Sequence, residues 1–308
     1  MNQVETQQNP ITKSQRNKGR VLIVVTALLW GLAGVCVKSI TWNSMSIMAA
    51  RSIPSLIMAL IAKGSIHLKF SKQNVLAAIM TTLTGTLYIG SIKLTTAGTA
   101  IVLQYVAPIL IFVYSVVFQK YKAKWYEALV TLAVFAGIVL SFADSLDPTR
   151  LLGNALGLMS GVTFAAQIIL MNKEEVDNSD VVAFSNIFSL ILCAPFLFFD
   201  KNLVFDFQNV IWILILGIFQ FGLANVCFAK GIKLVNKIEG SLLLTIEPIF
   251  NPIPVAIICH EMMGKMAIFG SAIVIVFVTL YGLLPTIEEK IEEKKQKNIQ
   301  GEKDTDNC

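Results

Sequence analysis

The chain has 308 residues, of which 55% are hydrophobic and 15% charged, with a mean hydropathy of +0.68 and a net charge of +5. A soluble globular domain carries about 25% charged residues, and here the charges are confined to connectors between long uncharged stretches. The composition therefore excludes a pair of soluble domains and indicates a membrane protein. The net charge comes from connector lysines and does not indicate nucleic-acid binding.

Apolar runs long enough to cross the hydrocarbon core as helices, about 20 residues each, predict an all-α polytopic fold with ten transmembrane helices. The first run lacks a short core followed by a small-residue cleavage site, so we interpret it as a permanent helix rather than a signal peptide. In chain order, the expected spans are 21–38, 45–62, 75–92, 99–118, 126–143, 151–171, 181–199, 209–229, 239–259 and 266–285.

The basic residues predict how the chain is oriented, because cytoplasmic connectors are enriched in Lys and Arg. With the N-terminus placed in the cytoplasm, 19 of the 25 Lys and Arg residues fall on the cytoplasmic side and five on the outer edges. We therefore expect a multi-pass protein of the cell membrane with both termini in the cytoplasm. Residues 1–20 and 286–308 are then cytoplasmic tails, the second of them a run of mixed charges.

Two segments recur at one spacing along the chain. The tripeptide Ile-Lys-Leu at 92–94 is found again at 232–234, and Pro108 recurs as Pro248, in both cases 140 residues later. An odd number of helices in each copy turns the second copy upside down in the membrane. Many secondary transporters are built from such inverted repeats, with a solute site near the midplane between the halves. The two expected five-helix repeats are 21–143 and 151–285.

Short motifs follow one another in order along both copies. They are Trp30-Gly31, Arg51, the segment 88–98, Gln104-Tyr105 with Pro108, the segment 230–236, Glu247-Pro248 and His260-Glu261. In this order they resemble paired EamA domains of the drug/metabolite transporter superfamily, from about residue 20 to residue 285. The first copy departs from the pattern, because Ala107 stands before its proline where the second copy has Glu247. The resemblance implies an exporter of metabolites, amino acids, amines or drugs.

Glu247 is the one carboxylate that the sequence places well inside a span, and Asn251 follows four residues later on the same helical face. Pro248 lacks an N–H, so the carbonyl of Leu244 is expected to lose its helical partner. A carboxylate beside a broken helix suits a solute-binding or proton-carrying position that lines a cavity. The alternative is that Glu247 caps loose backbone groups or bonds a neighbouring helix.

Arg51, in the second span, has two interpretations. It could reach inward to Glu247 if the helices tilt, or its long side chain could extend to the outer interface. Uncharged polar and aromatic residues complete the set, and they could either line a cavity or bond helix to helix. Together with Glu247, Asn251 and Arg51, the ten cavity candidates are Gln104, Tyr105, Gln167, Gln220, Asn225, Trp30 and Tyr88. Small residues at 153, 157 and 161 are expected to let a neighbouring helix approach closely.

The inverted repeat predicts a secondary transporter that moves a small organic solute by alternating access. The family resemblance implies export, with a proton gradient as the expected driving force. A membrane-embedded enzyme would need clustered His, Asp, Glu or Cys, but the only histidines, His67 and His260, lie at connectors. A channel would favour rings of like groups in an oligomer. No phosphate-binding loop is found, since Gly264-Lys265 is followed by methionine. We predict no catalytic residue, metal or cofactor; the expected partners are the solute and the lipid bilayer.

Overall fold

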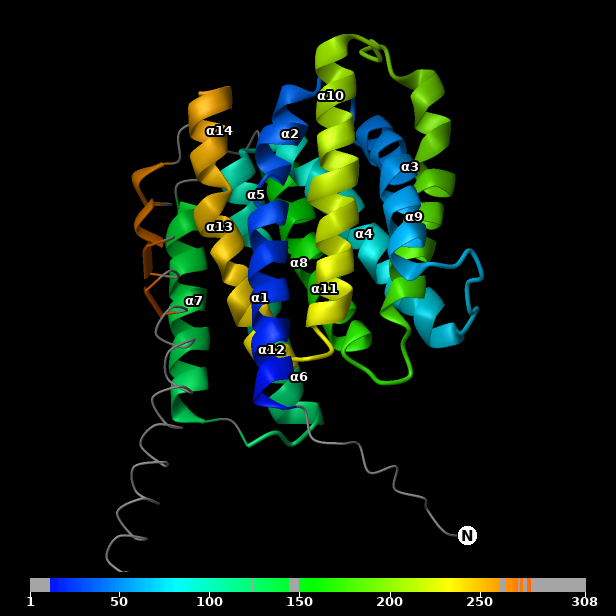
Figure 1. Ribbon diagram of the computed structural model, residues 1–308. Helices are drawn as coiled ribbons and strands as arrows, with labels where there is room; N and C mark the ends of the chain where they lie inside the picture. Colours follow the sequence, from blue (N-terminus) through cyan, green and yellow to red (C-terminus); the bar gives the residue numbers. More distant parts are fainter. Residues whose placement is uncertain are drawn as a thin grey trace, which may run out of the picture.

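The computed structural model describes residues 12–122, 124–143 and 150–260, together with 264–266, 268–270, 272–273 and 276–277. Within these ranges every regular element is a helix, which confirms the all-α class (Figure 1). Seven of the described helices are long and apolar enough to cross a membrane. The tail 286–308 and most of the expected span 266–285 lie outside the described residues, as do residues 1–11.

The first half of the chain forms elements α1 to α7. Polar side chains begin several of these helices: Asn43 and Ser71 each accept a hydrogen bond from the backbone N–H three residues on, which satisfies a donor that a helix start leaves free. Gly64, with a φ of 70°, ends α3 in a left-handed conformation that suits glycine. The elements are α1 (Lys13–Trp30), α2 (Ala33–Ser39), α3 (Ser44–Lys63), α4 (Lys72–Leu94), α5 (Ala97–Gln104), α6 (Ala107–Phe118) and α7 (Trp125–Ala143).

The second half is more often interrupted. Asp177 and Asp206 begin two of its helices by accepting hydrogen bonds from backbone N–H groups of the first turn. Its elements are α8 (Leu151–Met171), α9 (Asn178–Cys193), the 3-10 helix η2 (Ala194–Phe199), α10 (Phe207–Ile215), the π-helix η3 (Leu216–Leu223), α11 (Ala224–Gly231), α12 (Lys237–Leu243), the 3-10 helix η4 (Leu244–Ile246), α13 (Glu247–Phe250) and α14 (Pro252–Cys259).

Helix α1 begins at Lys13, within the segment expected to be a tail. Thr12 and Gln15 form a capping box, in which each side chain bonds the other residue's backbone N–H. Arg16 and Arg20 then bind the carboxylate of Glu239 at the start of α12, at 2.9 and 2.6 Å. These contacts order the basic segment as helix, which apolar patterning alone did not predict.

Several helices are broken near mid-length. Pro108 lies in the first turn of α6, which follows the end of α5, and Pro248 lies in the first turn of α13, which follows the end of η4. The two breaks are therefore at prolines 140 residues apart. The break between α1 and α2 falls at Gly31, where a Cβ atom would lie 2.6 Å from the ring of Phe250. A side chain at this position would have to displace that ring, so glycine allows α13 to pack closely against the break in the first span.

We call the end at which α1 begins the lower end and the opposite end the upper end, as they are drawn in Figure 1. Arg16 of α1, Asn74 at the start of α4 and Asn172 just after α8 line one open recess at the lower end. Ser91, near the end of α4, donates a 2.7 Å hydrogen bond to the carbonyl of Gly153, in the first turn of α8. Helix α4 therefore runs upward, as α1 does, and α8 runs downward.

The glycines of α8 face the first half of the chain. A Cβ on Gly153 would lie 2.8 Å from the backbone of Leu94 in α4, and a Cβ on Gly161 would lie 2.7 Å from the carbonyl oxygen of Gln104 in α5. The small-residue stripe thus serves close packing within the chain, as predicted, and it joins the two halves at the helix that carries Gln104.

Gly161→Ala is expected to destabilise the protein by about 1–3 kcal/mol, because the added methyl overlaps Val106 and backbone atoms that cannot yield. Gly90→Ala is the matched control, since its Cβ would meet only the end of the Leu156 side chain, at 3.2 Å. Thermal unfolding of the purified variants in detergent measures the difference. Equal unfolding temperatures for the two variants would contradict this account of the helix contact.

Candidate solute-binding cavity

A cavity lies between the two halves, and the centres of water molecules can occupy about 50 Å³ of it. This is room for several water molecules. Its lining comes from α1 to α5 of the first half and from α8, η3, α11 and α13 of the second. Eight of the ten residues predicted as cavity candidates line it: Trp30, Arg51, Tyr88, Gln104, Gln167, Gln220, Asn225 and Glu247.

Arg51 is buried, with 1% of its surface exposed, so its side chain does not extend to the outer interface. It forms no ion pair with any described residue, Glu247 included. Its guanidinium carbon lies 3.5 Å from the ring centre of Phe221. A cation–π contact contributes about 0.5–2 kcal/mol, whereas burying an unpaired charge costs several kcal/mol. The contact with Phe221 therefore offsets only part of the free-energy cost of burying this cation.

Glu247 is also buried, and its side chain is hydrogen-bonded to the hydroxyl of Tyr105 at 3.0 Å. The Tyr105 hydroxyl also bonds the carbonyl of Leu244. The sequence predicted that this carbonyl lacks a helical partner, but it accepts the backbone N–H of Glu247 in the 3-10 turn η4. A phenol has one hydrogen, and a carbonyl oxygen can only accept. Both contacts are satisfied together when Tyr105 donates to Leu244 and a protonated Glu247 donates to Tyr105. The arrangement therefore suits a carboxyl group that carries a proton.

The remaining polar groups occupy the same cavity with few protein partners. Gln220 donates to the carbonyl of Trp30 at 3.4 Å, while the Tyr88 hydroxyl and the amide nitrogen of Asn225 have no hydrogen-bond partner. Trp30 packs edge-on against Phe164, with ring centres 5.6 Å apart. The cavity thus combines aromatic walls with a small number of polar groups, as small-molecule sites commonly do.

Two predicted residues do not line the cavity. Tyr105 lies outside the lining and contacts Glu247, which is part of it. Asn251 lies at the junction between α13 and α14, fully buried, and neither the oxygen nor the nitrogen of its side-chain amide has a hydrogen-bond partner. A Cβ on Gly34 of α2 would lie 2.7 Å from the Asn251 side-chain oxygen. Asn251 therefore faces the first span rather than the space beside Glu247.

The structure adds lining residues that the sequence did not single out, among them Thr81, Thr84, Phe164 and Phe221. Thr81 and Thr84 lie on one helical face with Tyr88, at a spacing that an amphipathic reading of the third span would have detected. Phe221 gave no such signal, since one phenylalanine in an apolar span resembles any other. Its contact with the guanidinium depends on the position of Arg51, which lies far away in the sequence.

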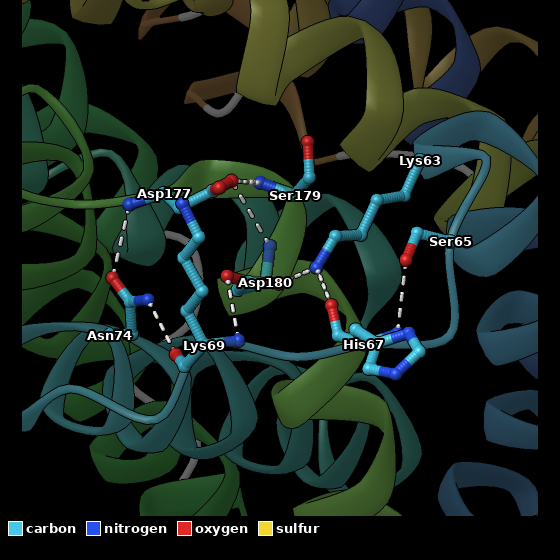
Figure 2. Close-up of polar contacts among 8 residues, drawn as sticks. All are labelled: Lys63, Ser65, His67, Lys69, Asn74, Asp177, Ser179 and Asp180. Carbon is cyan, nitrogen blue, oxygen red and sulfur yellow. Dashed lines mark hydrogen bonds and ion pairs between the residues drawn. The ribbon is translucent and has the colours of Figure 1, made fainter.

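Polar contacts join the halves at the lower end of the bundle (Figure 2). The carboxylate of Asp180, in the first turn of α9, forms an ion pair with Lys63 at the end of α3 and accepts the backbone N–H of Lys69 at 3.1 Å. Asn74 links the same segments, because its amide donates to the carbonyl of Lys69 and accepts the N–H of Asp177, both at 3.0 Å. The start of α9 is thus held against the loop that follows α3.

The upper end has its own contacts between the halves. The N–H of Asn43 donates to Asp200 at 2.8 Å, the indole of Trp42 to the carbonyl of Val204 at 2.9 Å, and the N–H of Thr41 to Asn209 at 2.9 Å. Burial acts to raise the pKa of Asp200, but hydrogen bonds, including that from Asn43, outweigh it and lower the pKa overall. The cavity therefore lies between two ends at which the halves touch.

Tyr105→Phe is expected to destabilise the protein by about 1–3 kcal/mol, because it removes the hydroxyl that bonds Leu244 and Glu247 in a buried site. Tyr88→Phe, the matched control, removes a buried hydroxyl without a partner and should leave stability within about 0.5 kcal/mol. Thermal unfolding of both variants is the measurement. If Tyr88→Phe proves the more destabilising, the hydrogen-bond assignment around Glu247 is wrong.

Comparisons with known proteins agree with this architecture. A family model described as the EamA-like transporter family matches residues 17–143 and again residues 151–283. A solved chain described as "Crystal structure of protein" is similar in fold, with a TM-score of 0.71 at 15% identity, covering 87% of this chain and 97% of that chain. No curated protein matches the sequence. Because the family model covers most of the chain in two successive copies, this protein belongs to the EamA-like transporter family.

Proposed function

We propose that this protein is a secondary transporter that exports a small organic metabolite, such as an amino acid, an amine or a drug-like solute, across the cell membrane. The observation that carries the proposal is the cavity, which is lined by both halves and contains Arg51 and Glu247. A buried cation and a buried carboxyl group in one space are costly for a protein that only needs to pack. Membership of a transporter family supports the same conclusion.

Alternating access is the expected mechanism. We propose ten spans arranged as two inverted five-helix repeats, with both termini in the cytoplasm, so that the lower end faces the cytoplasm. The opposite directions of α1 and α8 and the equivalent breaks at Pro108 and Pro248 support this arrangement. Two inverted halves can exchange conformations and open a shared site to one side and then to the other.

Proton coupling is part of the proposal and is assigned to Glu247. The titratable and charged groups near it are Tyr105, which touches it, and Tyr88 and Arg51, which line the same cavity. With no cation paired to it, Glu247 can accept a proton when the cavity opens to one side and lose it on the other. A carboxyl group used in this way would couple the movement of solute to that of protons.

The test is solute movement in proteoliposomes that contain the purified full chain. Radiolabelled amino acids, amines and nucleosides are supplied with and without an imposed pH gradient. Saturable uptake that an excess of unlabelled solute on the opposite side accelerates supports a carrier, because that exchange requires alternating access. Flux that never saturates indicates a channel, and chemical alteration of a lipid or solute without transport indicates an enzyme; either outcome overturns the proposal.

A further inference from the structure

The cavity has an excess of hydrogen-bond donors. The unpartnered buried atoms of its lining residues are Nε and Nη1 of Arg51, the hydroxyl of Tyr88 and the amide nitrogen of Asn225, and all of them can donate. The remaining terminal nitrogen of Arg51 has the sulfur of Met48 as its hydrogen-bond partner, at 2.7 Å, and a thioether is a weak acceptor. No described side chain therefore supplies the anion that a buried guanidinium requires.

We propose that Arg51 recognises a carboxylate group on the transported solute, an inference that rests on the transport function proposed above. The planar guanidinium matches a carboxylate, which can bind two of its N–H groups at once. A carboxylate that displaced the flexible thioether of Met48 would engage Nη2 together with a neighbouring nitrogen of Arg51. The donors of Tyr88 and Asn225 are in the same space to bind further oxygens of the solute.

The charges in the cavity favour a carboxylate over other groups. Arg51 is the only Lys or Arg among the lining residues, and Glu247 is the only acid. A phosphate monoester carries about −1.5 to −2 charge and is usually bound by clusters of arginine, so one guanidinium near a carboxyl group suits it poorly. An amine without an acid group would leave Arg51 unpaired. A solute with one carboxylate neutralises Arg51 without adding a second uncompensated charge.

The backbone beside Arg51 is also unusual. Phe221, which covers the guanidinium, and Gln220 both belong to the π-helix η3. π-helical turns are rare and often occur at functional sites. The segment packs closely on α3, since a Cβ on Gly217 would lie 2.7 Å from the backbone oxygen of Arg51. The widened turn thus places an aromatic ring and an amide next to the one cation of the cavity.

The experiment measures binding rather than transport, so that its failure can be separated from failure of the transport proposal. Thermal unfolding of the purified full chain is followed with two matched sets of compounds: leucine, isoamylamine and isocaproate, and phenylalanine, phenethylamine and hydrocinnamate. In each set the amine lacks the carboxylate and the acid lacks the amino group. We expect the amino acid or the acid of at least one set to bind about 10- to 100-fold more tightly than its amine.

Arg51→Met should weaken carboxylate binding by about 10- to 100-fold, and Arg51→Lys by less, because lysine keeps the charge but loses the two-pronged geometry. Lys201→Met, which removes one exposed positive charge at the upper end, is the matched control and should bind as the unaltered chain does. If Arg51→Met cannot be purified, Arg51→Lys decides the comparison.

Three results would overturn the inference. The amines could bind as tightly as the acids, the arginine variants could retain carboxylate binding within about threefold, or no compound with a carboxylate could bind the unaltered chain. If an amine or another solute without a carboxylate is nevertheless exchanged by proteoliposomes, the protein remains a transporter and only the role of Arg51 is wrong.

Discussion

Glu247→Gln is expected to abolish solute movement driven by a pH gradient while preserving exchange of labelled for unlabelled solute. Glutamine keeps the size of the side chain and can still bond the hydroxyl of Tyr105, but it cannot bind and release a proton. Coupling would therefore be lost while the cavity stays intact. A residue that couples transport to protons acts by gaining and losing a proton within the membrane. We therefore expect gradient-driven uptake to fall by roughly 10-fold or more.

The measurement compares gradient-driven uptake with exchange at equal pH on the two sides of the proteoliposome membrane. Glu127→Gln is the matched control, because Glu127 is a buried acid at the start of α7, bonded to the Tyr121 hydroxyl at 3.0 Å and outside the cavity lining. It should leave the pH dependence unchanged. If a pH gradient drives uptake by the Glu247→Gln variant as strongly as uptake by the unaltered chain, Glu247 does not carry the coupled proton.

Asp180→Asn is expected to destabilise the lower end and to alter the balance between inward- and outward-facing states. Asp180 is fully buried and bonds both Lys63 and the backbone of Lys69 (Figure 2). Removing one partner of a buried ion pair typically costs about 3–5 kcal/mol, because the other charge is left buried and unpaired. For Asp180 we expect the unfolding temperature to fall by roughly 5–10 °C.

Lys63 lines a small cleft between α3, α9 and α11, beside the open recess of the lower end. The ion pair is thus placed to hold the halves together on one side of the cavity. A double variant, Lys63→Met with Asp180→Leu, removes both charges and should recover most of the lost stability. It should still change the exchange rate, because the contact between Lys63 and Asp180 no longer helps to close the lower end.

Glu175→Gln is the control for this experiment, since it converts an exposed acid at the same end to an amide and should change stability by no more than about 0.5 kcal/mol. A double variant as unstable as Asp180→Asn would contradict the ion-pair explanation. Unchanged exchange in every variant would mean that this contact stabilises the fold but does not govern the opening of the lower end.

The candidate site was predicted in part, and the misses have specific causes. Intramembrane polar residues are rare and costly in lipid, so a list of them drawn from the sequence already contained eight cavity residues. Asn251 was grouped with Glu247 because the two share a face of an ideal helix. The backbone between them is helical, with the Asn251 N–H bonded to the Glu247 carbonyl at 2.8 Å, but the side chain of Asn251 packs beside Gly34 of α2. Arg51 was given two roles, and it adopts neither, because the π-helix covers it with Phe221.

The sequence by itself determined that the chain is a helical membrane protein, because uninterrupted apolar runs have no other stable arrangement in lipid or water. It also determined the repeat and the family, since both depend on residue order. Only the tertiary structure decided which side chains meet and that Arg51 has no anionic partner among the described residues. Those outcomes depend on contacts between residues more than a hundred positions apart, such as Tyr105 with Glu247, which no local pattern specifies.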